Sequence, residues 1–237
     1  MNSNNTNLFL SLVIPCFNEE ENLRNDIDFH RSSVNKYLNE NNYEIIFVDD
    51  FSNDNTLNLL EEYESNYKNI KVIKNNHNLG VGYSLDKGFQ ASSSKYVMHN
   101  SADLAYRYEN FDEIVNYCNK DYDLIILDRG KRTANTFWRK MTSYTWNKLV
   151  KVILNLNFND MNFIQIYKTS LIRKINKKNF TPAGYTVEYI YKISKQNAKI
   201  IVLNRIFCKR IRGKANYGKF KDIFISLLGL ILLFFDK

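Results

Sequence analysis

The chain has 237 residues, a length that suits one α/β domain with a short appendage. Hydrophobic residues make up 44% and charged residues 24%, which is the composition of a folded globular protein and excludes a largely disordered one. The net charge of +8 favours anionic partners, namely nucleic acid, an anionic membrane surface or phosphorylated small molecules.

Three cysteines, Cys16, Cys118 and Cys208, are too widely spaced for a disulfide framework or a zinc site. Reduced thiols are typical of cytosolic proteins. The first seven residues are polar and lack the apolar core of a signal peptide. We therefore predict a cytoplasmic protein.

The predicted elements begin with an apolar run over residues 8–15, which is typical of a strand buried on both faces. Asn18 and the three acids after it are typical of a helix start, with Asn18 as the cap. Asp54 is expected to cap a second helix. Further strands are predicted over residues 43–48, 70–73, 96–99, 124–127 and 200–203, and further helices over residues 81–91, 111–118, 137–154 and 186–196.

Strands that alternate with helices predict a largely parallel sheet with helices on both faces, in the manner of a Rossmann-like α/β fold. In such sheets, ligands bind beyond the carboxyl ends of the strands. We therefore expect the residues that follow the strands to meet in one crevice. They are Phe17, Asn18, Glu19, Asp49, Asp50, Ser101, Asp103, Asp128 and Arg129.

The first loop carries acids where a nucleotide-binding loop would carry glycines. Neither a P-loop nor a GxGxxG motif follows the first strand, which counts against ATPase and dinucleotide-binding functions. Acids there can accept hydrogen bonds from a base or a ribose. Asp103 follows the fourth strand, where a carboxylate can hold Mg²⁺ or Mn²⁺ against a diphosphate.

Two segments carry a family resemblance. The sequence SLVIPCFNEEENL over residues 11–23 resembles the opening of family 2 glycosyltransferases of the GT-A fold, and YEIIFVDDFSNDNT over residues 43–56 resembles their second motif. Asn78-Leu79-Gly80 and Lys87-Gly88 are similar to the third motif, and residues 101–104 stand where the family has its D-x-D. The branch that the chain resembles most is that of the dolichyl- and polyprenyl-phosphate sugar transferases.

The resemblance implies a nucleotide-sugar donor and a role for each matching residue. Asp103, Arg139 and Asp160 would be catalytic, with Asp103 as the metal ligand. The donor would contact Pro15, Phe17, Asn18, Glu19, Asp50, Ser101, Ala102 and Asp103. The donor and acceptor phosphates would contact Arg129, Arg139, Gln165, Arg210 and Lys214, and Gly213 would lie in the same basic loop.

The sequence departs from the family pattern at three places: Ser101 replaces the first acid of the D-x-D, Ala105 replaces a metal-assisting residue, and Ile164-Gln165 stands where Phe-Arg is expected. Asp103 is then the one sure anionic metal ligand, so binding of Mg²⁺ or Mn²⁺ should be weak. A lipid-phosphate acceptor is already anionic and needs no general base, whereas a hydroxyl acceptor does.

The chain is expected to consist of a GT-A domain over residues 1–220 and an apolar C-terminal helix over residues 221–237. This helix is too short to span a bilayer, which needs about 20 residues. It follows a basic stretch, Lys209 to Lys221, and this order is typical of an interfacial anchor on anionic lipid. Of the histidines, His77 and His99 are expected to be structural and His30 to face solvent.

The predicted function is transfer of a hexose, with inversion, from a GDP- or UDP-sugar to a polyprenyl phosphate. The protein would lie peripherally on the inner face of the membrane and would not bind nucleic acid. Two alternatives stay open. One is transfer to a saccharide hydroxyl in surface polysaccharide synthesis, and the other is a catalytically impaired sugar-nucleotide binding protein, because Ser101 replaces the first acid.

Overall fold

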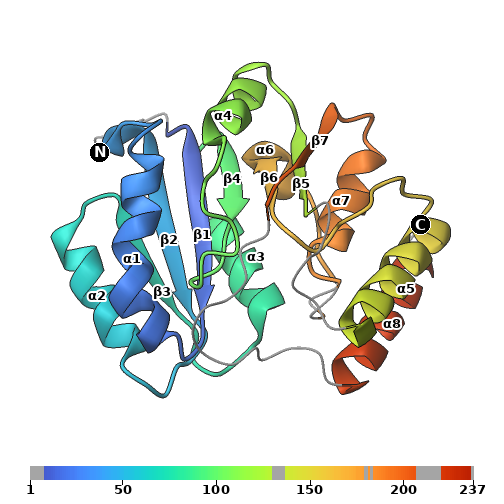
Figure 1. Ribbon diagram of the computed structural model, residues 1–237, viewed down its shortest axis with the longest axis horizontal. Coiled ribbons are helices and arrows are strands. Elements are labelled where there is room, and N and C mark those ends of the chain that lie inside the picture. Colours follow the sequence, from blue (N-terminus) through green and yellow to red (C-terminus); the bar gives the residue numbers. More distant parts are fainter. Residues whose placement is uncertain (1–7, 130–136, 179–180, 182–183, 207–219, 236–237) are drawn as a thin grey trace.

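The computed structural model describes residues 8–129, 137–178, 181, 184–206 and 220–235 (Figure 1). These residues form a seven-stranded sheet in the order β3-β2-β1-β4-β6-β5-β7. Neighbouring strands run parallel except where β6 pairs with β4 and β5. The strands are β1 (Leu10–Cys16), β2 (Tyr43–Asp49), β3 (Ile70–Lys74), β4 (Tyr96–His99), β5 (Leu124–Asp128), β6 (Gln165–Lys168) and β7 (Ile200–Asn204).

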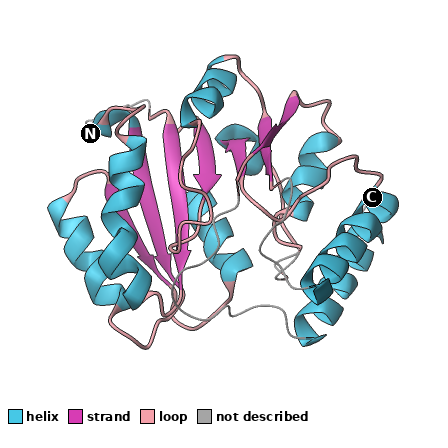
Figure 2. Ribbon diagram, viewed as in Figure 1, coloured by secondary structure: helices cyan, strands magenta, loops and turns pink. Residues whose placement is uncertain are grey.

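Helices cover both faces of the sheet (Figure 2). One face packs against α1 (Glu20–Val34), α2 (Thr56–Asn66) and α4 (Phe111–Asn119). The other packs against α3 (Val81–Ala91), α5 (Phe137–Leu154), α6 (Thr169–Ile172), α7 (Val187–Ser194) and α8 (Phe220–Phe235). A short 3₁₀ helix, η1 (Glu40–Asn42), leads into β2.

The alternation of side chains along β1 divides the apolar core into two layers. Leu12 and Ile14 belong to the cluster beneath α1 and α2, whereas Val13 belongs to the cluster beneath α3. Gly88 lets α3 approach closely, because a Cβ atom there would lie 2.3 Å from Val13 Cγ1. Parallel pairing then brings the ends of β1 and β2 together, with Cys16 opposite Asp49.

The predicted fold class is confirmed, but the predicted N-cap of the first helix is wrong. The helix α1 begins at Glu20 with Glu19 as its N-cap, whereas Asn18 adopts a left-handed conformation with φ 53° and is not the cap. The antiparallel strand β6 was not predicted, because it has four residues and follows an irregular segment.

The helices α5 and α8 lie side by side at the right of Figure 1. Leu230 and Leu233 of α8 are buried in the same cluster as Val150 and Leu154 of α5. Among the helices that the structure describes, none is both long and apolar enough to cross a bilayer.

Candidate active site

The loops that follow β1 and β2 are tied together by reciprocal hydrogen bonds. Asn18 N–H donates to Ser52 Oγ (3.0 Å), and Asn53 N–H donates back to Asn18 Oδ1 (2.8 Å). Glu19 N–H donates to Thr56 Oγ1 (2.9 Å). Short polar side chains therefore satisfy the backbone amides that a turn leaves unpaired. The result is a rigid rim of the crevice.

A second link joins the same two loops through carboxylates. Glu20 N–H donates to Asp54 Oδ2 (3.2 Å), and Asn55 N–H donates to Glu20 Oε2 (3.1 Å). Asp54 also accepts the N–H of Thr56 (3.0 Å), but the N-cap of α2 is Asn55, so the prediction that Asp54 caps this helix is wrong by one residue.

Asp50 is buried and its carboxylate holds the loop after β3. Its two oxygens accept the N–H groups of Leu79 (2.9 Å) and Gly80 (2.8 Å), and Oδ1 also accepts Asn75 Nδ2 (2.8 Å). Gly80 has φ 86°, a conformation that suits glycine. The sequence did not point to Asn75, although it directly follows β3. Asp50 therefore orders the wall of the crevice, and its predicted contact with the donor stays a prediction.

Ser101 and Asp103 lie in a tight loop after β4. Ser101 Oγ accepts the N–H of Ala105 (3.1 Å), and Ser101 O accepts the N–H of Leu104 (3.0 Å). The Ser101 hydroxyl is thus directed into its own loop. Asp103 is half-buried, and the Ala102 side chain between them is buried.

Arg129 and Asp160 form a two-pronged ion pair between the end of β5 and the segment before β6. Arg129 Nη2 donates to Asp160 Oδ1 (2.8 Å), and Arg129 Nε donates to Asp160 Oδ2. The Asp160 side chain is 2% exposed, whereas the Arg129 side chain is 17% exposed. Because the pair as a whole is neutral, its main effect is to fix the orientation of the Arg129 guanidinium.

Gln165 is fully buried in β6 and both ends of its amide are engaged. Its Oε1 lies 2.9 Å from His99 Nε2, and its Nε2 donates to Met161 O (3.2 Å). Burial lowers the pKa of His99 to about 4, so this histidine is neutral and structural, as predicted. Since Gln165 has no exposed surface, we leave it out of the proposed phosphate contacts.

His30 is buried, contrary to the sequence prediction that it faces solvent. Its Nδ1 lies 2.6 Å from the hydroxyl of Tyr108, which belongs to the loop that follows β4. Burial lowers the pKa of His30 to about 3. The sequence around His30 did not predict this burial, because its partner Tyr108 lies 78 residues away in the chain.

The sheet topology places the loops after β1, β2, β4 and β5 at the same edge of the sheet, and these loops carry the candidate residues Phe17, Asn18, Glu19, Asp50, Ser101, Ala102, Asp103 and Arg129. Pro15 lies within β1, and Asp160 is the partner of Arg129. Arg210, Gly213 and Lys214 lie outside the described residues. The backbone of Arg139 belongs to α5, but its side chain is likewise not described.

Within the described ranges, no group of three or more His, Cys, Asp or Glu side chains is placed to hold a metal ion. Asp103 alone is compatible with binding of Mg²⁺ that is shared with the substrate, because Mg²⁺ is commonly held by one or two carboxylates together with substrate phosphates. The donor set therefore fits a metal that arrives with a diphosphate.

The arrangement of strands and loops agrees with sequence comparison. The model of glycosyl transferase family 2 matches residues 11–180, and the chain belongs to this family. The undecaprenyl-phosphate 4-deoxy-4-formamido-L-arabinose transferase of Pectobacterium atrosepticum is 34% identical over 143 residues, which are 60% of this chain and 43% of that protein.

A second relative is the poly(ribitol-phosphate) β-N-acetylglucosaminyltransferase TarP of Staphylococcus aureus, 27% identical over 213 residues. That match covers 82% of this chain and 63% of TarP, so the chain spans about half to two thirds of these relatives. Among solved structures, glucosyl-3-phosphoglycerate synthase from Mycobacterium tuberculosis, in complex with Mn²⁺, uridine diphosphate and phosphoglyceric acid, superposes with a TM-score of 0.69. The identity is 15%, and the match covers 97% of this chain and 78% of that one. The fold is therefore that of the GT-A glycosyltransferases.

Proposed function

We propose that the chain transfers a hexose, with inversion, from a GDP- or UDP-sugar to a polyprenyl phosphate at the cytoplasmic face of the membrane. The observation that supports this proposal most is that the loops after β1, β2 and β4, which carry the candidate residues, lie at one edge of the sheet. The chain also belongs to glycosyl transferase family 2. The relative from Pectobacterium bears the name of an undecaprenyl-phosphate sugar transferase, which supports the acceptor class.

The rim formed by the two locked loops would receive the nucleoside. Phe17 and Glu19 are half-buried there, so each offers part of its side chain to a base or ribose. Asp50 would act by holding the Leu79–Gly80 turn against the same pocket. Because these loops are already ordered, binding the nucleoside would cost little conformational entropy.

Asp103 would face the diphosphate and, when Mg²⁺ or Mn²⁺ is bound, would be its ligand from this chain. Such an ion supplies charge neutralisation of a nucleoside diphosphate. The Ser101 hydroxyl, which is directed to Ala105, adds no charge. Arg129, oriented by Asp160, would donate a hydrogen bond to the phosphates, in keeping with its predicted role.

The chemical step would be a displacement at the anomeric carbon. An oxygen of the acceptor phosphate forms a bond to that carbon, and the bond from the carbon to the nucleoside diphosphate breaks. The electron pair of the broken bond leaves with the diphosphate. No proton has to be removed from the acceptor, so the reaction needs no general base, and Asp160 is left to hold Arg129.

An exposed apolar surface lies on α5 and α8, and it supports binding at a membrane. Its exposed side chains are Tyr144, Leu149, Val152, Phe224, Leu228, Leu232 and Phe235, and three of them (Val152, Leu232 and Phe235) are more than 70% exposed. Soluble proteins rarely expose so many contiguous apolar side chains. Lys148 is exposed on α5 beside them, which suits anionic headgroups.

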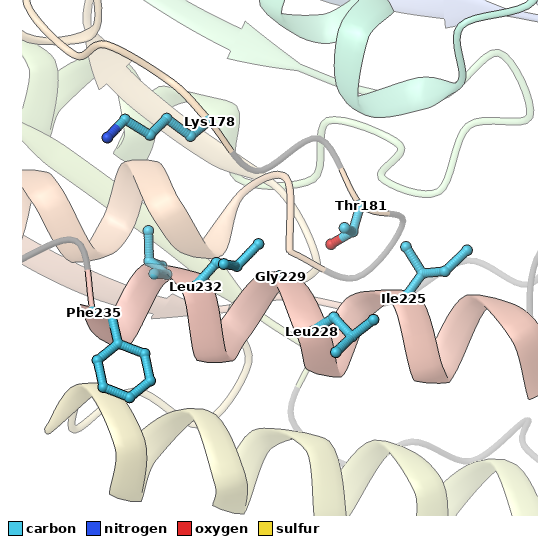
Figure 3. A pocket seen from close by; sticks show the side chains of 8 residues that line it. Lys178, Thr181, Ile225, Leu228, Gly229, Leu232 and Phe235 are labelled. Atoms are coloured by element: carbon cyan, nitrogen blue, oxygen red, sulfur yellow. The ribbon is translucent and has the colours of Figure 1, made fainter.

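A groove of about 440 Å³ opens beside this surface, between α8 and the side chains of Lys178 and Thr181 (Figure 3). Ile225, Leu228 and Leu232 line it, and Gly229 leaves its floor without a side chain. An apolar groove next to an apolar helix surface is consistent with contact to hydrocarbon chains.

The proposal is tested by incubating the protein with radiolabelled GDP- and UDP-hexoses and vesicles that contain a polyprenyl phosphate. We expect label in the organic phase with one donor class and none with the variant Asp103→Asn. Absence of labelled lipid with every common donor would contradict the proposal.

Two other functions are favoured by specific observations. TarP bears the name of a transferase to poly(ribitol phosphate), which favours a saccharide hydroxyl as acceptor. The inward Ser101 hydroxyl favours a binding protein with impaired catalysis. The first alternative predicts label in a soluble glycan, and the second predicts nucleotide binding that is indifferent to Mn²⁺ and gives no turnover.

A further inference from the structure

The loop that carries Asp103 has an unusual backbone. Within ten residues, three non-glycine residues adopt left-handed conformations, namely Leu104 (φ 56°), Tyr108 (φ 62°) and Asn110 (φ 52°). Residues other than glycine adopt such angles infrequently, and they persist where the surrounding structure determines them. The contacts that hold this loop therefore decide where the Asp103 carboxylate lies.

The near end of the loop is held by Asn100 from within. Asn100 Nδ2 donates to Tyr106 O (2.8 Å), and Asn100 Oδ1 accepts the N–H of Ser101 (2.9 Å). These side-chain bonds close the loop on itself. Its two ends are attached to the sheet, because Asn100 N–H donates to Val13 O (3.1 Å) and Arg205 Nη2 donates to Asn110 O (3.3 Å).

The far end of the loop is attached to α1 through His30. The Tyr108 hydroxyl lies 2.6 Å from His30 Nδ1, and the two rings meet edge to face with centroids 5.9 Å apart. Both side chains are buried, and Ala102 and Leu104 lie in the same apolar cluster as Tyr108. The other ring nitrogen, Nε2, is buried without a hydrogen bond of normal geometry to any residue that the structure describes.

Residues near the start of the loop also affect the pKa of His30. The backbone of Ala102 and the charge of Asp103 both oppose the burial that lowers the pKa of His30. The contact with Tyr108 is the hydrogen bond that ties the imidazole to the loop. A hydrogen bond between two buried side chains fixes their relative position.

We propose that His30 is a positioning residue, which through Tyr108 holds the loop over residues 100–110 so that Asp103 meets the donor diphosphate. This inference rests on the proposed function. The role would matter more here than in a protein with a complete D-x-D, because Ser101 leaves Asp103 as the one acid of the motif. An error in the position of a single carboxylate has no second ligand to correct it.

The test compares Tyr108→Phe with the matched control Tyr96→Phe. Both changes remove one hydroxyl from a buried tyrosine, since Tyr96 donates to Cys118 O (2.9 Å). Tyr96 lies at the amino end of β4, away from the crevice. Calorimetry would measure affinities for UDP and UMP, and for GDP and GMP, with Mn²⁺ present. The ratio of diphosphate to monophosphate affinity isolates the contribution of the terminal phosphate.

We expect Tyr108→Phe to lower this ratio about tenfold, the usual scale for loss of a group that orients a metal ligand, and to leave monophosphate affinity unchanged. His30→Gln, which keeps a group able to bond Tyr108, should retain most of the ratio. If Tyr108→Phe matches Tyr96→Phe, the inference is overturned while the proposed function stands. If the unaltered protein binds none of the nucleotides, the proposed function itself fails.

Discussion

Arg129 and Asp160 face each other through two nearly parallel contacts, with Nη2 2.8 Å from Oδ1 and Nε bonded to Oδ2. Thirty-one residues separate them in the chain, and they join the end of β5 to the segment before β6. Asp160 also accepts the N–H of Asn162 (3.3 Å), which fixes its orientation. The predicted catalytic acid is therefore a partner of the predicted phosphate-binding arginine.

This pairing predicts that Asp160→Asn acts on stability. The change leaves a mostly buried guanidinium without its countercharge, which typically costs about 3 kcal/mol. Urea unfolding of the variant should show a loss of this size. A loss of activity without any loss in the free energy of unfolding would show instead that Asp160 acts in the chemistry.

Restoring the missing acid should strengthen metal binding. In Ser101→Asp, a second carboxylate would join Asp103, and we expect Mn²⁺ affinity in the presence of UDP or GDP to rise about tenfold or more. Calorimetric titration of Mn²⁺ measures the effect, with Ser101→Asn as the uncharged control. Equal affinities for the two variants would show that position 101 does not face the metal.

Gly88 and Gly80 should respond to alanine for different reasons. In Gly88→Ala the new Cβ would collide with Val13 Cγ1, and overpacking of this kind costs about 1–3 kcal/mol. In Gly80→Ala no atom lies within 4 Å of the new Cβ, but the φ of 86° is strained for alanine. Only the second change should also disturb the turn that Asp50 holds, so nucleotide affinity should fall for Gly80→Ala at equal stability.

The buried histidines predict a pH dependence of stability. His30 and His99 have pKa values of about 3 and about 4 in the folded protein, below the ordinary value of 6.5. The folded state thus binds fewer protons, so their stabilisation is complete above pH 6.5 and is lost as the pH falls toward these values. Each histidine contributes a slope of about 1.4 kcal/mol per pH unit.

The variant His99→Gln checks this slope, because glutamine does not titrate. Between pH 6.5 and 5, its free energy of unfolding should fall by about 1 kcal/mol per pH unit less than that of the unaltered protein, because the unfolded histidine is only half protonated at pH 6.5. Equal slopes for the two proteins would mean that His99 is already protonated in the fold or accessible to solvent.

The apolar surface on α5 and α8 predicts binding to vesicles. Leu232→Asp and Phe235→Asp should each weaken sedimentation with phosphatidylglycerol vesicles about tenfold or more. Each change removes apolar surface that would enter the bilayer, and each adds a negative charge that the anionic lipid repels. Ile206→Asp is the control, because Ile206 is exposed but lies outside this surface. Equal loss in all three variants would indicate a general charge effect.

Much of the fold could be predicted because buried parallel strands read as continuous apolar runs. The strands β1, β2 and β5 are of this kind, and their ends lie within two residues of the predicted ones. The strand β6 could not be found in this way, since its four residues are ordered by pairing with β4 and β5 on either side. Such pairing depends on distant sequence.

The positions of candidate residues could be predicted where the residues directly follow strands. They could not be predicted where a side chain contacts a residue that is distant in the sequence. Asp50 and Asp103 follow β2 and β4, and the rules for parallel sheets place them together. His30 lies in the middle of a helix, and its partner Tyr108 is 78 residues away. The burial of Gln165 likewise depends on His99, a contact that no local pattern specifies.

The most direct test of the central claim compares two lipid acceptors, one that ends in a phosphate and one that ends in a hydroxyl. Initial rates would be measured with a polyprenyl phosphate and with the uncharged polyprenol of the same chain length, using the donor that gives turnover. Because the crevice is proposed to use an acceptor that needs no general base, we expect transfer to the phosphate and none to the alcohol. Transfer to the polyprenol or to a soluble glycan, with none to the phosphate, would contradict the account.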